Sequence, residues 1–388
     1  MRLVIERLLR DGSSSRAELS RATGLSKQTV SEVMRALERA GWAREDGQIQ
    51  GGVGRTAVSY ALRPDAAFVL GIDLGGTKLH VALADLAGAV VAERMEATDP
   101  AGGEAVVAQI GRVARALVAE GNVDPTRLHG AVMGSPGIVE PATGAIAIAP
   151  NVPGLDRFDV RGALAAALGV ETAIENDVNL AAVGEHWRGR SRGQRNFVFV
   201  AVGTGIGMGI FADGQMIRGA RGAAGEIAYL PLGGDPFDAR GRVLGTLESA
   251  VGSAAIRDRY AGAGGAPGAS VRDIFDRLGD DETARATLDE CARTIATALL
   301  AVHAVLDPEI VILGGSVGAR PELRARVAAH LARCMAEPVP VEISALGSRA
   351  TLVGAVGSAI DGVHRSLFGL GAETSPLALP AVLPDAAE

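Results

Sequence analysis

The 388-residue chain has few cysteines and no long apolar run, and each shortage excludes a class of protein. Its two cysteines, Cys291 and Cys334, form no CxxC pair, so we expect neither a disulfide scaffold nor a cysteine metal site. No window reaches the roughly twenty apolar residues of a membrane helix. The first twelve residues scatter charges among apolar positions, unlike a signal peptide. These absences predict a cytoplasmic protein without a membrane partner.

The composition that is present is that of a globular protein. Hydrophobic residues make up 48% of the chain and charged residues 21%, and the length suits two or three domains. The net charge of −7 is uneven, because residues 1–64 carry eleven Lys and Arg against seven Asp and Glu. A basic N-terminal segment on an otherwise acidic chain favours nucleic-acid contact by residues 1–64 alone. The alternative is that this uneven distribution of charge arose by chance in an Arg-rich sequence.

Three short helices are predicted in the basic N-terminal segment. Ser15 and Glu18 form a capping box at the start of the second helix, and Gly24 suits its left-handed end. Ser26 caps the third helix. Helical spacing places one apolar face on this helix, at Val30, Val33, Met34 and Leu37. The pattern is that of a helix-turn-helix.

The polar face of the third helix is the predicted DNA-reading surface. Its side chains are Ser26, Lys27, Gln28, Thr29, Ser31 and Arg35. Two expected strands, 42–46 and 56–62, flank the loop GQIQGGVGR, which resembles a wing and offers Arg55 to a minor groove. We therefore predict an α+β winged helix-turn-helix DNA-binding domain over 1–64. A protein-interaction or dimerisation module of the same shape is the alternative.

From residue 66 onward, strand-like runs alternate with helices, which predicts an α/β domain over 66–367. Its two lobes are expected at about 66–195 and 196–367. Each lobe opens with a glycine-rich strand turn, a pattern that suggests an ancient duplication. Residues 369–388 are rich in Pro and Ala without any period and predict a flexible tail.

Two glycine-rich turns are candidates for phosphate binding. GIDLGGTK begins at Gly71 and lets backbone N–H groups approach phosphate oxygens, while Asp73 could hold magnesium through water. Its spacing matches neither a Walker A loop nor GxGxxG, so such a turn alone would more often be structural. GTGIG at Gly203 lies about 130 residues later and adds the Thr204 hydroxyl. Two such turns argue against chance.

Between the turns, the segment Glu175-Asn176-Asp177 precedes a predicted helix. Phosphoryl transfer to an alcohol needs a carboxylate that accepts the hydroxyl proton, and Asp177 is the candidate general base. The alternative is that Asp177 is only a helix N-cap.

Over 66–367 the chain resembles the ROK family (repressor, open reading frame, kinase), and its winged helix is typical of the transcriptional-regulator branch. The resemblance rests on the first glycine turn from Asp73, PGIVEPATG from Pro136, and the motifs APN, END, GTGIG, GAAGEI and EIVILGGSVG. It implies an actin-like, hexokinase-like fold of two lobes. It also implies two sets of binding residues.

The sugar-binding residues implied by the resemblance are Asn151, Asn176, Asp177, Glu226, Tyr229 and Glu248. The nucleotide- or phosphate-binding residues implied by it are Asp73, Gly75, Gly76, Thr77, Lys78, Gly203, Thr204, Gly205, Gly314 and Gly315.

One departure from the family concerns its structural zinc. Tyr229 replaces the zinc-binding histidine, and residues 239–248 replace a cysteine-rich loop. No histidine occurs between His186 and His303, and Cys291 is the only cysteine there. Since such sites use four Cys or His ligands, we expect no zinc and no bound metal at this site. Either packing has replaced the metal without effect, or sugar specificity has changed and catalysis has weakened.

These features predict a sugar-responsive regulator, of repressor type, that binds operator DNA as a homodimer or a dimer of dimers. Its effector would be a sugar or sugar derivative bound in the kinase-like domain. The alternative is an active ATP-dependent sugar kinase that uses Mg-ATP, with Asp177 as general base and an accessory DNA-binding domain. A purely structural dimerisation protein is a third hypothesis, which leaves the sugar ligands unexplained. We expect the regulator rather than the enzyme.

Overall fold

The computed structural model describes residues 1–51, 55–147, 152–369, 377, 379 and 380. The chain forms two compact units. The first comprises Met1–Gly137, Gly144–Glu175 and Ala355–Glu388, and the second comprises Ile138–Thr143 and Asn176–Gly354. The units thus change at Asn176 and again at Ala355, whereas the sequence placed one lobe boundary near 195. The division into 1–64, 66–367 and 369–388 stays a prediction, and most of its tail lies outside the described residues.

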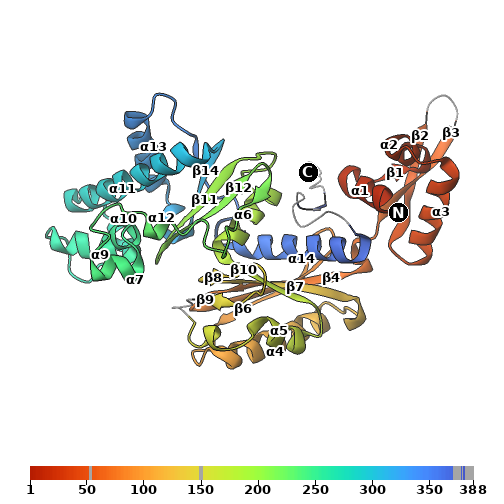
Figure 1. The fold of residues 1–388 in the computed structure, drawn as a ribbon, viewed down its shortest axis with the longest axis horizontal. Coiled ribbons are helices and arrows are strands. Elements are labelled where there is room, and N and C mark those ends of the chain that lie inside the picture. The colour runs from red at the N-terminus through yellow and green to blue at the C-terminus, as the bar shows by residue number, and fades with distance from the viewer. Residues whose placement is uncertain (52–54, 148–151, 370–376, 378, 381–388) are drawn as a thin grey trace. The chain divides into compact units, whose positions relative to one another are not determined.

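The N-terminal elements form a winged helix-turn-helix, in accord with the sequence (Figure 1). Its helices are α1 (Arg2–Asp11), α2 (Arg16–Thr23) and α3 (Lys27–Arg39). Its antiparallel sheet has the order β1-β3-β2, with β1 at Ser14–Ser15, β2 at Ala43–Gly51 and β3 at Arg55–Leu62.

Local sequence signals explain where these helices begin and end. The capping box of Ser15 and Glu18 is confirmed, and Gly24 ends α2 at φ 72°. Ser26 caps α3 by accepting the Thr29 N–H at 3.1 Å. The buried faces of the three helices meet in one small core with Tyr60 of β3. This core fixes which face of α3 remains outside.

The predicted wing is shorter than expected. β2 does not end at Asp46 but continues to Gly51, because residues from Gln48 onward pair with β3 beyond a bulge. Much of the segment predicted as a loop is therefore strand. Residues 52–54 lie outside the described residues, and of Arg55 only the backbone is described, as the start of β3.

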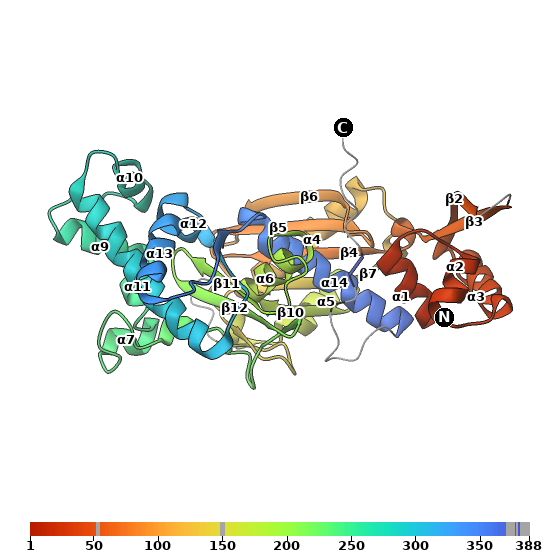
Figure 2. The ribbon, with the colours of Figure 1, turned by 90° about the horizontal axis from the view of Figure 1, so that it is seen from above.

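The first unit also contains a five-stranded sheet of order β10-β7-β4-β5-β6. The strands are β4 (Phe68–Leu74), β5 (Lys78–Asp85), β6 (Val90–Ala97), β7 (Leu128–Ser135) and β10 (Thr172–Asn176). Helices α4 (Gly103–Glu120) and α5 (Val160–Leu168) lie on one side of it, and α14 (Ala350–Phe368) crosses the other (Figures 1 and 2). Gly130 of β7 allows this approach, because a Cβ there would lie 3.5 Å from Val363.

The second unit has a five-stranded sheet of order β13-β12-β11-β14-β15. The strands are β11 (Phe197–Val202), β12 (Ile206–Ala212), β13 (Gln215–Met216), β14 (Ile310–Gly314) and β15 (Val341–Ile343). Alternate side chains of β11 divide between its faces. Phe197 stacks with His186 of α6 (Asp177–Arg188), whereas Val198 and Val200 join the core with α11 (Glu282–Leu306) and α13 (Pro321–Cys334).

The two sheets share one topology, in agreement with the suspected duplication. In each, three antiparallel strands follow one another, and the next long strand pairs in parallel with the first of them. Each glycine-rich turn therefore joins the first strand of its sheet to the second. The α/β fold predicted from the alternating elements is confirmed.

Shorter elements complete the described chain. The 3₁₀ turns are η1 (Pro64–Ala66), η2 (Pro125–Arg127), η3 (Leu155–Arg157), η4 (Ile227–Tyr229) and η5 (Gly347–Arg349). The short strands are β8 (Ile138–Val139) and β9 (Ile146–Ala147), and the remaining helices are α7 (Ala239–Leu244), α8 (Glu248–Val251), α9 (Ser253–Gly262), α10 (Val271–Asp276) and α12 (Gly315–Gly318). Of the helices described, none has the length and apolarity to cross a bilayer.

Candidate functional site

The outer face of α3 presents the polar side chains predicted to read DNA. Lys27, Gln28, Thr29 and Arg35 are exposed, and Ser31 is partly exposed. Two of them make contacts within the helix: the Gln28 amide donates to Glu32 at 3.2 Å, and the Arg35 Nε donates to the Ser31 carbonyl at 3.2 Å. The remaining guanidinium N–H groups of Arg35 suit a phosphate or a guanine edge.

The first glycine turn connects β4 to β5. Gly76, Thr77 and Lys78 are exposed there. Thr98 supports the turn, since its hydroxyl donates to the Gly75 carbonyl at 2.7 Å and its N–H donates to the Thr77 carbonyl at 3.2 Å. These two hydrogen bonds fix the backbone of the turn, which a backbone anion site requires.

Asp73, just before this turn, is largely withdrawn from water. Burial raises the pKa of Asp73 to about 6, although the positive charge of Lys78 lowers it. Its carboxyl therefore changes charge near neutral pH, and a cation would stabilise the ionised form. This environment suits the predicted contact with magnesium through water.

The second glycine turn connects β11 to β12 and is held by the start of α9. The Ser253 hydroxyl and N–H both donate to the Gly203 carbonyl, at 2.6 and 2.9 Å. Glu248 accepts the Ile206 N–H at 3.1 Å. A Cβ on Gly205 would lie 2.3 Å from the Glu248 carboxylate, so this position needs glycine. A predicted sugar ligand thus contacts the phosphate-side turn directly.

The fold brings a third glycine segment next to the second. Because β11 and β14 pair in parallel, Gly314 lies beside the end of β11. Gly315 has φ +79°, and a Cβ there would lie 2.4 Å from the Val202 carbonyl oxygen. A Cβ on Gly203 would lie 3.2 Å from the Ser316 hydroxyl. Two predicted phosphate-binding segments, more than a hundred residues apart in sequence, are therefore neighbours in the fold.

At the start of α6, Asn176 and Asp177 have different structural roles. Asn176, not Asp177, is the N-cap, and its Oδ1 accepts the N–H groups of Val178 at 2.9 Å and Asn179 at 3.0 Å. Asp177 is the first helical residue, and its carboxylate accepts the Val178 N–H at 2.9 Å. The carboxylate lies at the positive end of the helix dipole. The N-cap alternative for Asp177 is therefore wrong.

Two half-buried glutamates of the second unit, Glu226 and Glu248, are predicted sugar ligands. Burial, followed by the negative charge of Glu248, raises the pKa of Glu226 above its usual range. Burial also raises the pKa of Glu248, while the hydrogen bond from Ile206 lowers it. Two such carboxylates can accept hydroxyl groups of a polyol and gain most when a ligand supplies those donors. Asn151, a further predicted ligand, lies outside the described residues.

The loop expected to lack zinc is held by backbone contacts. The Tyr229 side chain is 48% exposed, and its hydroxyl donates to the Val243 carbonyl of α7 at 3.4 Å. The Leu247 N–H donates to the Ala228 carbonyl at 2.9 Å. In the described part of the chain, no group of three or more Cys, His, Asp or Glu could hold a metal ion. Burial raises the pKa of Cys291 to about 12, so a zinc site does not fit these residues.

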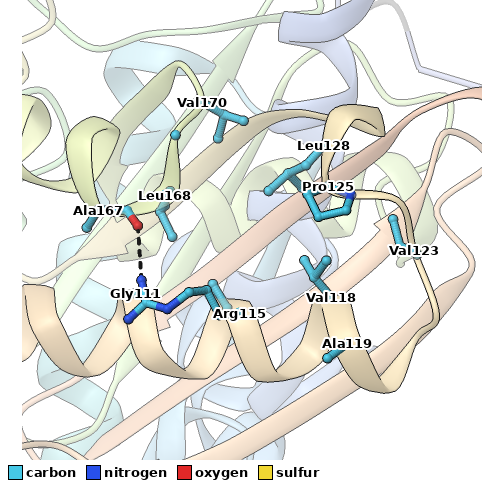
Figure 3. Close-up of a pocket in the computed structure, with 12 residues that line it drawn as sticks. Gly111, Arg115, Val118, Ala119, Val123, Pro125, Leu128, Ala167, Leu168 and Val170 are labelled. Carbon is cyan, nitrogen blue, oxygen red and sulfur yellow. Dashed lines mark hydrogen bonds between the residues drawn. The ribbon is translucent and has the colours of Figure 1, made fainter.

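A separate pocket in the first unit has a different chemistry (Figure 3). It encloses about 400 Å³ between α4 and α5 and is lined mostly by apolar side chains. Arg115 crosses it to donate to the Ala167 carbonyl at 3.4 Å (Figure 3). Its lining includes no carboxylate and none of the predicted ligands. It does not suit a polyhydroxylated ligand.

The sequence pattern did not single out three supporting residues. Ser253 braces the second glycine turn, Thr98 braces the first, and the Thr351 hydroxyl donates to the Asp177 carbonyl at 3.2 Å. Each is a single hydroxyl far in sequence from the segment that it supports. The N-cap role of Asn176 could have been inferred from its residue type at the start of a helix. No spacing rule in the sequence marks Ser253, Thr98 or Thr351.

Comparison with known proteins agrees with this architecture. Residues 69–361 match the ROK family, and residues 2–44 match a winged helix-turn-helix DNA-binding family. A β-glucoside kinase of Listeria monocytogenes is 28% identical over 291 residues, or 74% of this chain and 96% of the relative. A xylose repressor of Caldicellulosiruptor bescii is 28% identical over 233 residues, or 59% of this chain and 58% of the repressor.

A solved structure extends the likeness to the N-terminal domain. A ROK family transcriptional regulator, described as a homologue of the E. coli MLC protein, superposes with a TM-score of 0.76. The match covers 92% of this chain and 93% of that one at 23% identity, which establishes the fold. Since the family match spans most of the chain, this protein belongs to the ROK family.

Proposed function

We propose that this protein is a sugar-responsive transcriptional regulator of repressor type. One observation carries the proposal: a winged helix with an exposed polar recognition face precedes a ROK domain whose sugar-side carboxylates are present but whose zinc ligands are not. A DNA-reading surface has no use in a free-standing kinase. The similarity to a xylose repressor supports the same function.

The proposed effector is a sugar or sugar derivative. The carboxylates of Glu226 and Glu248 would accept its hydroxyl groups, and the exposed ring of Tyr229 could pack against its apolar face. Asn151, Asn176 and Asp177 complete the proposed sugar site.

Regulation requires that the effector distinguish two states of the protein. A homodimer would place two α3 helices on a palindromic operator, as helix-turn-helix dimers do. Sugar binding weakens operator binding only if the sugar binds the DNA-incompetent state more tightly. The same coupling makes operator DNA weaken sugar binding by an equal factor.

The test is equilibrium binding of the full chain to labelled duplexes that cover the DNA flanking its own gene. We expect one fragment to bind with a much higher affinity than random DNA at the same salt concentration. A thermal-shift screen of sugars supplies the effector, because a ligand of the native state raises the unfolding temperature. Adding that sugar should release the fragment. Failure to bind any such fragment at low salt would refute the proposal.

An ATP-dependent sugar kinase is the second candidate, favoured by the adjoining glycine segments after β11 and β14 and by Asp177 at the start of α6. In that reaction a sugar hydroxyl attacks the γ-phosphorus of Mg-ATP, the bond to ADP breaks, and Asp177 accepts the hydroxyl proton. The first glycine turn, with Asp73, Gly75, Gly76, Thr77 and Lys78, would lie on the phosphate side.

An ADP-release assay over hexoses, pentoses and amino sugars tests the kinase. Asp177→Asn should abolish any turnover, whereas Asp280→Asn, a change at an exposed carboxylate, should not. Turnover that survives Asp177→Asn would remove Asp177 from the role of base. No ADP release with any sugar that raises the unfolding temperature would favour the sensor alone.

A further inference from the structure

Helix α14 contacts a different functional element at each of its ends. Residues up to Gly354 belong to the second unit, and those from Ala355 to Phe368 belong to the first. We propose that α14 transmits the state of the sugar site at Asp177 to the winged helix through Phe368 and Trp42. This inference rests on the proposed sensor function and names the element that performs its regulation.

The first turn of α14 is packed on α6, the helix that begins at the proposed sugar site. The Thr351 hydroxyl donates to the carbonyl oxygen of Asp177 at 3.2 Å. A Cβ on Gly354 would lie 1.8 Å from the Leu180 carbonyl oxygen, and one on Gly184 would lie 2.3 Å from the Ala350 carbonyl oxygen. The two backbones are therefore in direct contact. Such a contact has no side-chain freedom to absorb a shift of α6.

A buried carboxylate strengthens the same junction. Glu185 of α6 is fully buried and accepts the Ser344 hydroxyl at 2.5 Å and the Leu346 N–H at 3.1 Å. Both donors lie in the segment that leads into α14. Hydrogen bonds to a buried polar group are costly to break, so this segment should follow α6 when α6 moves.

The last turn of α14 contacts the winged helix. The ring of Phe368 meets that of Trp42 edge to face, with centroids 5.1 Å apart at 85°. Trp42 also lies 6.0 Å from the ring of His129 in β7, and Phe368 stacks with His364 at 6.0 Å. Phe368 packs against the small core of the winged helix. The C-terminal end of α14 therefore contacts the core of the winged helix.

Trp42 connects this contact to the recognition helix. Its N–H donates to the carbonyl of Leu37, in the last turn of α3, at 2.8 Å. Its own carbonyl accepts the Arg63 N–H at 2.8 Å, just before the η1 turn that leads to β4. A displacement of Phe368 therefore acts on the residue that closes α3. Over its 19 residues, an α-helix rises about 28 Å.

The experiment compares variants by how strongly the sugar changes their operator Kd, rather than by their affinity for either ligand. For each variant, the operator Kd is measured with and without D-xylose or D-glucose, whichever raises the unfolding temperature of the wild type. Phe368→Ala should leave sugar affinity and sugar-free operator affinity within about twofold of the wild type, while the ratio of the two operator Kd values falls toward one. Leu367→Ala, one residue earlier and 42% exposed, is the matched control and should keep the ratio. Phe368→Tyr retains the ring and should restore the coupling.

A spectroscopic readout covers the case in which Phe368→Ala lowers stability. The chain has two tryptophans, so Trp187→Phe leaves Trp42 as the only indole. Its emission should shift on addition of the sugar in this background, and the shift should be smaller when Thr351→Val is added. Thr351→Val removes the hydroxyl at the opposite end of α14 and leaves the aromatic contact intact.

The outcomes separate this inference from the function on which it rests. If the sugar does not change operator affinity in the wild type, the proposed sensor function fails. If it does so in the wild type and equally in Phe368→Ala and Thr351→Val, the sensor function stands and the role of α14 is refuted.

Discussion

Gly205 shows at the scale of one residue how the proposed sugar ligand Glu248 and the second glycine turn are joined. Its missing side chain lets Glu248 reach the second glycine turn and accept the Ile206 N–H. A methyl group there would push the carboxylate away. The turn and the carboxylate thus depend on each other.

We therefore expect Gly205→Ala to lower sugar affinity by roughly tenfold or more, about 1.4 kcal/mol, because Glu248 loses its hydrogen bond and its position. Titration calorimetry with the sugar found by thermal shift measures this. Gly262→Ala is the matched control, since a Cβ there meets no atom within 4 Å. Equal sugar affinity in the two variants would contradict the role of Gly205.

Burial of Asp73 makes the stability of the fold depend on pH. Its pKa rises from 3.8 to about 6 in the folded state. The folded protein therefore keeps this proton at a pH where the unfolded chain has lost it. Between about pH 4 and 6, the free energy of unfolding falls as pH rises. Above about pH 6, the buried carboxylate is ionised and its full destabilising effect is present.

Asp73→Asn removes that cost, so the variant should be more stable than the wild type at pH 7.5, by up to about 3 kcal/mol. The difference should vanish below about pH 4, where Asp73 is protonated in both states. Urea unfolding across this pH range measures it. Asp280→Asn, at an exposed position, should show no such pH dependence. A constant difference at all pH values would contradict the assigned cause.

At the scale of elements, α3 separates its faces as the sequence indicates. Val30, Met34 and Leu37 are buried, and Lys27 and Arg35 are exposed. The hydrophobic core fixes the orientation of the helix, because these apolar side chains must leave water.

Lys27→Gln and Arg35→Gln should each weaken operator binding by about tenfold at low salt. If the lost contact is to a phosphate, the slope of log Kd against log salt should also fall by about one. Fluorescence anisotropy at several salt concentrations measures both quantities. Arg272→Gln on α10, in the second unit, is the control. Unchanged DNA binding in both α3 variants would place the DNA surface elsewhere.

The loop between η4 and α8 is held by contacts of its own backbone and of Tyr229. A backbone hydrogen bond joins Leu247 to Ala228, and the Tyr229 hydroxyl reaches Val243. A Cβ on Gly233 would lie 2.4 Å from the Ala250 side chain, so the loop packs closely against α8. These contacts are the kind that would orient the loop if packing has replaced the metal.

At the scale of the whole molecule, the chain uses lysine at only two positions, Lys27 and Lys78. Both are exposed, one at the start of α3 and one at the end of the first glycine turn. The two proposed anion-binding surfaces therefore carry one distinct amine each. Any amine-reactive reagent can report on the two surfaces separately.

We expect operator DNA to protect Lys27 from acetylation while Lys78 stays reactive. Mg-ATP should protect Lys78 alone if the first glycine turn binds phosphates. Quantitative mass spectrometry of the acetylated peptides measures both, with the N-terminal amine as internal reference. Lys27 that reacts equally with and without bound operator would contradict the assigned DNA surface.

Much of this protein was predictable from the sequence. Capping residues and apolar spacing located the three N-terminal helices, because such signals act within a few residues. The strand boundaries of the wing were not predictable, since β2 continues beyond Asp46 through pairing with β3. Likewise the cap of α6 depends on which side-chain oxygen reaches the first N–H groups, and Asn176 reaches them.

The sequence by itself determined the kinds of element, the two glycine turns and the absence of a cysteine and histidine set for zinc. These follow from composition and short spacings. Only the tertiary structure decided that Gly314 adjoins the second glycine turn, that Ser253 and Glu248 hold that turn, and that Trp42 meets Phe368. The physical reason is that hydrogen bonds and packing join atoms by distance in space, and chain folding sets those distances independently of separation along the sequence.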